Sequence, residues 1–504
     1  MKFIQYVHSR WMRGFSLLTL GPNEARIFYD FLAGCAALFL TLVFNAFFIN
    51  ASFGLGLFLL PFLHLAFNAA AGVYSYLKTM VGKKKAVLLL VILLFVCGIA
   101  LLVGMHPSLV VLWGFLMAGP LVLPRILLGL PYGRHKNIIK RVVNEKGPVL
   151  VVGGAGYIGS HVVDLLLREG RNVRVLDRLM YGKDSLSEFL NHRYFELIEG
   201  DATDISKLTL AMKDVSAVVH LAGLVGDPAC SVDSNFTRHT NIIATKMVKE
   251  IAQSVGVRRF VFASSCSVYG VSDNKVREDD PLNPVSLYAQ TKIDSERELL
   301  FSVPDDFFVT ILRFATVFGH SRRPRFDLVA NLLTAQAMED GLIRVIGPGQ
   351  WRPFIHVRDL ARAVLFVLKA DPAMIQGQIY NVGDKRLNMT IGKLGEEITN
   401  IVARFRDVQI NVQENPADRR NYAVSFDKIR SSIGFEAKIM LHEGIEEMVE
   451  HFRKGTYGSY REKVYNNLVV TKDALDNFRD PAYSSRLYAP IGEQVRHESP
   501  MEET

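Results

Sequence analysis

The 504-residue sequence predicts an α/β domain on a doubly wound parallel sheet, with a smaller C-terminal lobe, preceded by four transmembrane α-helices. Three observations support this fold class. Short β-branched runs alternate with helical stretches after about residue 148, as in parallel sheets with crossover helices. A glycine-rich turn follows the first of these runs. Two long blocks without charged residues precede them.

The charge-free blocks occupy 31–77 and 86–124. Because a membrane helix needs about 20 apolar residues, each block is long enough for two spans, and turn-forming residues lie near the middle of each. A cleaved signal peptide does not account for four such segments. The expected spans, in a transmembrane region at 1–130, are 27–49, 54–77, 86–105 and 108–124.

Basic residues lie before the first expected span, between the second and third, and after the fourth. This distribution predicts a multi-pass protein of the inner (cytoplasmic) membrane with its large C-terminal part in the cytoplasm. The net charge of +8 fits an anionic bilayer surface and is not evidence for nucleic-acid binding. The spans hold too few polar residues for a transport path, so anchoring is their expected role.

A basic connector at 131–147 leads into a predicted cofactor-binding domain at 148–315, whose continuously apolar strands indicate a sheet buried on both faces. Loops rich in Pro and Arg predict a smaller substrate lobe at 316–459, and 460–504 is interpreted as an arm or tail. The expected strands are 148–153, 172–177, 194–201, 217–223, 259–265 and 308–314, and the expected helices include 158–169, 239–255 and 286–301.

The four cysteines do not form a pattern. Cys35 and Cys97 lie in expected spans, whereas Cys230 and Cys266 are far apart in the remainder, and none belongs to a CxxC motif. The sequence therefore predicts neither a disulfide framework nor a metal site.

A dinucleotide site is predicted at "GGAGYIGS", where Gly153, Gly156 and Gly159 follow a strand and open a helix. Glycines permit a tight turn and close approach of a pyrophosphate, which the helix N-terminus attracts. Asp177 ends the next strand, 18 residues past Gly159, and is placed to hold the adenosine ribose. Its carboxylate favours NAD over NADP, although the adjacent Arg178 softens that preference.

The stretch "SLYAQTK" places Tyr288 and Lys292 four residues apart, on one face of an expected helix. This spacing alone does not distinguish a catalytic pair from ordinary helix neighbours. The other motifs of the chain favour catalysis.

Nine motifs in order resemble the extended short-chain dehydrogenases, and more narrowly the NAD-dependent epimerase/dehydratase family that acts on nucleotide sugars. The resemblance covers about 148–450 and implies a Rossmann-like fold and a homodimer. The motifs are "GGAGYIGS", "LDRLMYG", "EGDATD", "VVHLAG", "RFVFASSCSVYG", "SLYAQTK", "LRFATVFG", "RPFIHVRDLA" and "YNVG".

The resemblance also implies roles for individual residues. Ser265, Tyr288 and Lys292 match the catalytic serine, tyrosine and lysine. Arg352 matches a substrate-phosphate arginine, and Asn331 and Arg420 are weaker matches for substrate contacts. The implied NAD-binding residues are Gly153, Gly156, Tyr157, Ile158, Gly159, Asp177, Asp201, Ala202, Ala222, Gly223, Tyr288 and Lys292.

In such a site, a lysine ammonium and the positive nicotinamide ring favour the phenolate of Tyr288, which accepts the proton of a sugar hydroxyl while hydride passes to NAD. Ser265 hydrogen-bonds the same oxygen. Family members that eliminate water carry an acidic pair directly after the catalytic Ser or Thr, and decarboxylases carry a nearby Glu. This chain has Cys266 and Ser267 there.

The sequence therefore favours a 4-epimerase, such as UDP-galactose 4-epimerase, that supplies glycan or polysaccharide biosynthesis. A keto-sugar reductase with the same three residues is the first alternative, and a non-catalytic NAD-binding scaffold is the second. Thr316 replaces an asparagine that contacts the nucleotide sugar in many relatives, which leaves the sugar and the nucleotide open.

Overall fold

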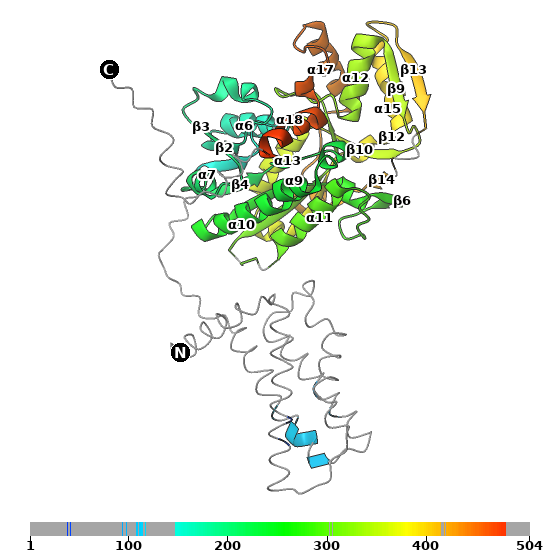
Figure 1. Ribbon diagram of the computed structural model, residues 1–504. Helices are drawn as coiled ribbons and strands as arrows, with labels where there is room; N and C mark the ends of the chain where they lie inside the picture. Colours follow the sequence, from blue (N-terminus) through cyan, green and yellow to red (C-terminus); the bar gives the residue numbers. More distant parts are fainter. Residues whose placement is uncertain are drawn as a thin grey trace, which may run out of the picture. The chain divides into compact units, whose positions relative to one another are not determined.

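The computed structural model describes residues 147–301, 303–304, 306–414, 418 and 420–479, with scattered positions between 38 and 116. Residues 142–504 form one compact unit. The part of this unit that the structure describes is an α/β domain with a smaller lobe (Figure 1).

A seven-stranded sheet in which every pairing is parallel forms the centre of the domain, with the order β11-β7-β5-β4-β1-β2-β3. The chain reverses its direction of winding between β1 and β4, and ligands bind outside the carboxyl ends of strands at such a point. The strands are β1 (Val149–Val152), β2 (Val173–Asp177), β3 (Phe195–Glu199), β4 (Ala217–His220), β5 (Arg259–Ser265), β7 (Phe308–Phe314) and β11 (Gln378–Val382).

Helices cover both faces of this sheet, which explains the continuously apolar strands. In β1, Val149 and Val151 belong to the core that α6 and α13 complete. Leu150 and Val152 point the other way, into the core shared with α7, α10 and α11. These helices are α6 (Gly159–Arg168), α7 (Ile205–Ala211), α10 (Ala244–Val255), α11 (Leu287–Leu300) and α13 (Val357–Lys369). The predicted Rossmann-like α/β fold is therefore confirmed.

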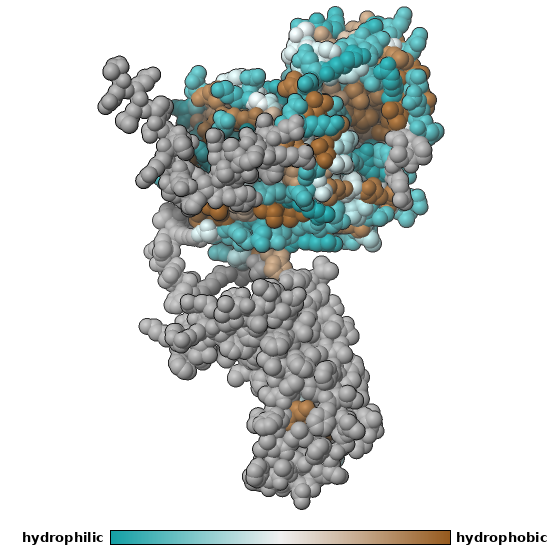
Figure 2. All heavy atoms as spheres, viewed as in Figure 1, coloured by the Kyte–Doolittle hydropathy of each residue, from teal (hydrophilic) through white to brown (hydrophobic). Residues whose placement is uncertain are grey.

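The smaller lobe is built around a separate core of buried apolar residues from α12, α15, α17 and the short strands beside them. Its strands pair as β12-β10-β8, β13-β9 and β14-β6. Hydrophilic residues cover much of the visible face of the domain, and apolar residues gather near β9 and β13 (Figure 2). The lobe elements are β6 (Val271–Val276), β8 (Thr316–Phe318), α12 (Val329–Asp340), β9 (Leu342–Ile346), β10 (Trp351–His356), β12 (Asn388–Thr390), α15 (Ile391–Val402), β13 (Gln409–Gln413), β14 (Asn421–Val424) and α17 (Leu441–Arg453).

The segment 316–459 contributes to more than the smaller lobe, because it also supplies β11 at the edge of the large sheet. Short elements complete the domain: η3 (Asp184–Phe189), α8 (Asp227–Cys230), α9 (Ser234–Arg238), η4 (His239–Ile243), η5 (Cys266–Tyr269), α14 (Pro372–Ile375), η6 (Lys385–Leu387), α16 (Asp427–Ile433), η7 (Lys463–Tyr465) and α18 (Asn467–Arg479).

The expected four transmembrane helices require a correction. Among the described residues, no helix is both long enough and apolar enough to cross a bilayer. The expected spans at 27–49, 54–77, 86–105 and 108–124 lie outside the described residues except for scattered positions, and nearly all of the connector at 131–147 does too. The predicted fold class is corrected to its α/β part.

Candidate active site

The turn between β1 and α6 is tight because its glycines leave no room for side chains. Gly153 has φ +88°, and a Cβ atom there would lie 2.6 Å from the backbone nitrogen of Ala222. A Cβ atom at Gly159 would lie 2.2 Å from the carbonyl oxygen of Gly153. At Gly156, by contrast, the nearest atom would be 3.4 Å away. The first turn of α6 has no side-chain cap, so its N–H groups are suited to phosphate oxygens.

Asp177 ends β2 beside this turn. Its carboxylate accepts hydrogen bonds from the backbone N–H groups of Ala155 and Leu179, both at 2.8 Å. Burial raises the pKa of Asp177, and these two N–H groups oppose the rise. The adjacent Arg178 pairs with Asp201, with 3.2 Å between Nε and Oδ2. The charge that could favour NADP therefore has a partner within the protein.

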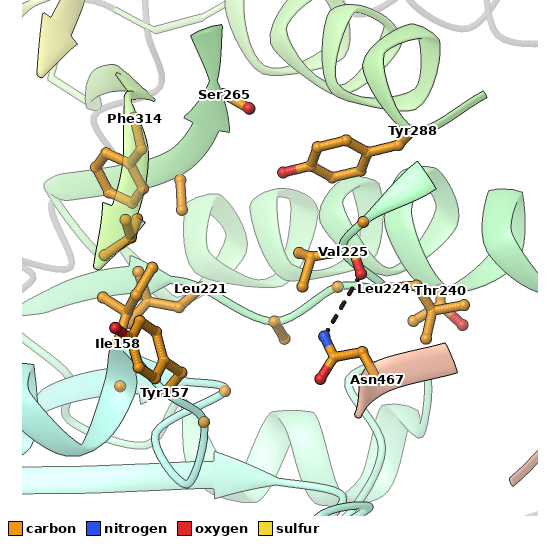
Figure 3. A pocket seen from close by; sticks show the side chains of 18 of the residues that line it. Tyr157, Ile158, Leu221, Leu224, Val225, Thr240, Ser265, Tyr288, Phe314 and Asn467 are labelled. Atoms are coloured by element: carbon orange, nitrogen blue, oxygen red, sulfur yellow. Dashed lines mark hydrogen bonds between the residues drawn. The ribbon is translucent and has the colours of Figure 1, made fainter. Parts of the chain in front are cut away.

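The catalytic trio predicted from the sequence comes together where β5 ends and α11 begins. Ser286 caps α11 by accepting a hydrogen bond from the N–H of Ala289, which places Tyr288 in the first turn. The side chain of Ser265 lies near Tyr288 and lowers its pKa. Lys292, one turn later, donates to the carbonyl oxygen of Ala263 at 2.8 Å. Figure 3 shows Ser265 and Tyr288 facing the same cavity.

Burial is the largest influence on the pKa values of Tyr288 and Lys292. It raises the pKa of Tyr288, and the nearby Ser265 side chain opposes the rise only in part. Burial lowers the pKa of Lys292 to about 8. The ammonium of Lys292 donates to the carbonyl oxygen of Ala263, so the phenolate of Tyr288 depends on further positive charge such as that of a bound nicotinamide ring. The sequence could not show these pKa shifts, because it does not reveal the burial of the two groups.

One cavity connects the glycine turn to the catalytic trio. It runs from Asp177 and Asp201 past the turn to Ser265 and Tyr288, and it also reaches Arg420. Every residue predicted to bind NAD lines it, namely Gly153, Gly156, Tyr157, Ile158, Gly159, Asp177, Asp201, Ala202, Ala222, Gly223, Tyr288 and Lys292.

The three predicted substrate residues are placed differently from one another. Arg420 lines the cavity, and its Nη1 lies 2.8 Å from Oδ2 of Asp227. Arg352 does not line the cavity; its guanidinium donates to the carbonyl oxygen of Arg420 at 2.6 Å. It therefore fixes the backbone of Arg420.

Asn331 also lies away from the cavity lining and is 1% exposed. Its Oδ1 accepts from the N–H of Gly319 at 3.0 Å, and its Nδ2 donates to Arg325 O and to the hydroxyl of Tyr157. The amide thus connects the loop after β8 to Tyr157 of the glycine turn through hydrogen bonds.

Sequence reasoning missed three residues that line the cavity: Asp227, Arg323 and Asn467. Asp227 begins α8 after the loop that follows β4, so a polar residue shortly after a buried strand was an available signal. Arg323 lies in the basic stretch "HSRRPRFD" at 320–327, so a cluster of arginines shortly after β8 was an available signal. Asn467 lies in a segment without a recognisable pattern.

Comparisons with known proteins agree with this geometry. Residues 149–383 match the model of the NAD dependent epimerase/dehydratase family. UDP-glucuronic acid decarboxylase 6 of Arabidopsis thaliana is 30% identical over 319 residues, which are 60% of this chain and 88% of the relative. The chain belongs to the NAD-dependent epimerase/dehydratase family.

Other members of the family are similar to a comparable degree. The dTDP-glucose 4,6-dehydratase of Streptomyces niveus is 28% identical over 317 residues, which are 60% of this chain and 92% of the relative. A solved UDP-glucuronic acid 4-epimerase from Bacillus cereus, in complex with UDP-glucuronic acid and NAD, is 25% identical with a TM-score of 0.55, and the match covers 62% of this chain and all of that one. The family thus includes dehydratases, decarboxylases and epimerases.

The cofactor of the family is NAD, and the residues of this cavity fit it. The uncapped start of α6 suits the pyrophosphate, and Asp177 suits a ribose diol. Lys292 has donors left for a second ribose, because one of its three N–H groups serves Ala263.

Replacement of Asp177 by alanine is expected to weaken NAD binding by roughly 10–100-fold, because hydrogen bonds to a charged group are lost. The ratio of NADP to NAD affinity should rise, since the carboxylate no longer repels a 2′-phosphate. Titration calorimetry with both dinucleotides measures this. Asp407→Ala, at an exposed position after α15 in the smaller lobe, is the control and should bind NAD normally. An unchanged dinucleotide ratio in Asp177→Ala would contradict the role.

Proposed function

We propose that this enzyme is a nucleotide-sugar 4-epimerase. The observation that carries the proposal is the composition of the cavity wall beside Ser265 and Tyr288. The acidic residues of the wall are Asp177, Asp201 and Asp227. The first two lie beside the glycine turn, and Asp227 is paired with Arg420. Among the described residues, each carboxylate of the wall is thus engaged by backbone N–H groups or by an arginine, although Oδ1 of Asp227 has no hydrogen-bond partner. None of them follows Ser265 directly in the chain, as the acidic pair does in the family members that eliminate water.

The two residues after Ser265 cannot replace such a carboxylate. The thiol of Cys266 is 1% exposed and donates to the carbonyl oxygen of Arg313 at 3.2 Å. Burial raises its pKa, so the thiol stays protonated. Ser267 lines the cavity, but a hydroxyl with an ordinary pKa is neither an acid nor a base at neutral pH.

The remaining groups suffice for reversible oxidation at one carbon. Bound NAD would supply reversible hydride transfer at C4 of the sugar. In its phenolate form, which the positive nicotinamide ring would favour, Tyr288 takes the proton of the C4 hydroxyl, and Ser265 donates a hydrogen bond to the same oxygen as it becomes a ketone oxygen. The keto sugar then rotates, so that its other face is directed at the cofactor. After the hydride has returned to this face, Tyr288 returns the proton to the oxygen. No proton or hydride is gained or lost in the cycle.

The substrate class is supported by Arg420, which presents a half-buried cation to the cavity and suits the diphosphate of a nucleotide sugar. Burial opposes the charge of this guanidinium, but the hydrogen bond to Asp418 and the nearby Asp227 raise its pKa above the ordinary value. The cation therefore persists at all relevant pH values. The complex of the Bacillus cereus relative with a UDP sugar supports this assignment.

The test incubates the purified protein with UDP- and GDP-hexoses and follows the product sugars together with NADH absorbance. Interconversion of C4 epimers without lasting NADH is expected. A sugar change that consumes stoichiometric NAD(P)H would identify a keto-sugar reductase instead. A 4-keto-6-deoxy product would identify a dehydratase.

The pH profile provides a second test. Because the pKa of Lys292 lies at about 8, its ammonium is lost as the pH rises through that value, and kcat/KM should fall on the alkaline side. The free energy of unfolding has the opposite pH dependence. Above the lowered pKa of Lys292, the unfolded state binds more protons than the native state, so the contribution of Lys292 to stability should rise with pH in that range. A pH series of kcat/KM measures the first effect. Lys292→Arg stays charged and should lose this alkaline limb; a wild-type profile that is flat well above pH 8 would contradict the assignment.

A further inference from the structure

The last described segment of the chain packs onto the loop between β8 and α12, beyond the family match at 149–383. The N–H of Phe326 donates to the carbonyl oxygen of Tyr465 at 3.1 Å. The hydroxyl of Tyr457 lies 2.7 Å from Nδ1 of His320. The rings of Tyr457 and Tyr465 meet Phe326 edge to face. These contacts fix the approach to α18.

Helix α18 then lies against the wall of the active-site cavity. Leu475 is 4% exposed and packs in an apolar cluster with Leu224 and Phe236, against which the ring of Tyr288 also packs. At the start of the helix, Asn467 is 1% exposed and lines the cavity. Its Nδ2 donates to the carbonyl oxygen of Val225 at 3.4 Å (Figure 3).

The side-chain oxygen of Asn467 accepts a hydrogen bond from an arginine. Nη2 of Arg323 donates to Oδ1 of Asn467 at 2.8 Å and to the carbonyl oxygen of Val464 at 3.3 Å. The guanidinium lies over the ring of Tyr181, 3.8 Å from its centroid. Arg323 is 5% exposed and lines the cavity, as does Tyr181.

This arginine lacks an anionic partner. In the described part of the chain, no carboxylate lies within ion-pair distance of Arg323, whereas its neighbour Arg325 pairs with Asp327 at 2.7 Å. Nε of Arg323 and the hydroxyl of Tyr181 are buried without a hydrogen-bond partner. Burial, together with Arg325, lowers the pKa of Arg323 to about 10. A buried, uncompensated cation is costly, and an anion in the cavity would offset that cost.

We propose that Arg323 and Tyr181, held in position by Asn467 of α18, bind a phosphate group, so that the C-terminal helix completes the active site. This inference deepens the proposed function, because a dinucleotide and a nucleotide sugar both carry a diphosphate. Tyr181 follows Asp177 by four residues, and the cavity passes between this loop and the glycine turn. Nε of Arg323 and the Tyr181 hydroxyl supply two donors from one side of that passage.

The test compares Arg323→Met, Asn467→Ala and Lys472→Ala, the last being a control at an exposed position of the same helix. Methionine removes the buried charge, so Arg323→Met should fold at least as stably as the wild type. Two probes separate the sources of phosphate: the exchange rate of bound NAD against labelled NAD, and the affinity for UDP. We expect Arg323→Met to change one of them by roughly 10–100-fold, Asn467→Ala to change the same one less, and Lys472→Ala to change neither.

Faster NAD exchange alone would place the cofactor diphosphate at the site, and weaker UDP binding alone would place the substrate diphosphate there. Unchanged values for both probes in Arg323→Met would overturn the proposal. An effect of Arg323→Met with none of Asn467→Ala, or an equal loss in Lys472→Ala, would overturn the part assigned to the helix. If these changes occur but the wild type converts no hexose, the epimerase proposal fails and the phosphate site stands.

Discussion

Replacement of Tyr288 by phenylalanine is expected to reduce the turnover of a nucleotide hexose by roughly 10²–10⁴-fold, the usual contribution of a positioned acid–base group. In the proposed reaction the phenol hydroxyl exchanges a proton with the sugar, and it faces the same cavity as Ser265. The ring of Tyr288 packs beside Leu224 and Leu475, and phenylalanine preserves that packing. The fold and the NAD content of the protein should therefore be unchanged.

The measurement is the initial rate of product formation at saturating hexose, with bound NAD quantified in the same sample. Tyr460→Phe is a matched control, because the Tyr460 hydroxyl bonds Asp340 in the smaller lobe, and it should retain full turnover. Wild-type rates in Tyr288→Phe would exclude acid–base chemistry at this residue.

The replacement of Glu296 by glutamine is expected to lower the free energy of unfolding by about 3–5 kcal/mol, the usual cost of breaking a buried ion pair. Arg313 and Glu296 form two parallel hydrogen bonds of 2.8 and 3.0 Å, with side chains 3% and 4% exposed. Ser264 of β5 donates to the same carboxylate. Removal of one charge leaves the other buried without compensation.

Chemical denaturation measures this effect. Glu250→Gln, which breaks the exposed Lys246–Glu250 pair, is the control and should cost about 0–1 kcal/mol. A double variant, Arg313→Met with Glu296→Leu, should recover much of the loss, because apolar residues of similar volume replace buried pairs well. A cost in Glu296→Gln no larger than that of the control would contradict a structural role. Since Glu296 lies one turn after Lys292 on α11, the pair also fixes the helix that carries Tyr288.

The residues predicted for the cofactor half of the site line one cavity, and their determinants are local. Gly153 and Gly159 act through backbone geometry within a single turn, and Asp177 ends the neighbouring strand. Motif spacing also located Ser265, Tyr288 and Lys292, which the structure gathers around one cavity. These features depend on elements that are regular and close in the sequence.

The other features of the site depend on side-chain partners, which a sequence motif does not specify. Asn331 and Arg352 match family positions, yet in this chain Asn331 bonds Gly319 and Arg352 bonds the carbonyl oxygen of Arg420. Asn467 lies in a segment interpreted as an arm, and its place in the cavity depends on contacts across more than 140 residues of sequence, such as that with Arg323. Burial, which sets the pKa values of Tyr288 and Lys292, is likewise a property of the assembled fold.

The central sheet has a consequence for how the chain reaches its native state. All of its pairings are parallel, so no two of its strands are joined by a short hairpin. Phe308–Phe314 must find Arg259–Ser265 on one side and Gln378–Val382 on the other. The loop-closure entropy of these distant pairings is lost before their contacts form, which makes folding slow. The catalytic serine and tyrosine flank this late-forming centre, so the active site can assemble only in the final, cooperative stage of folding.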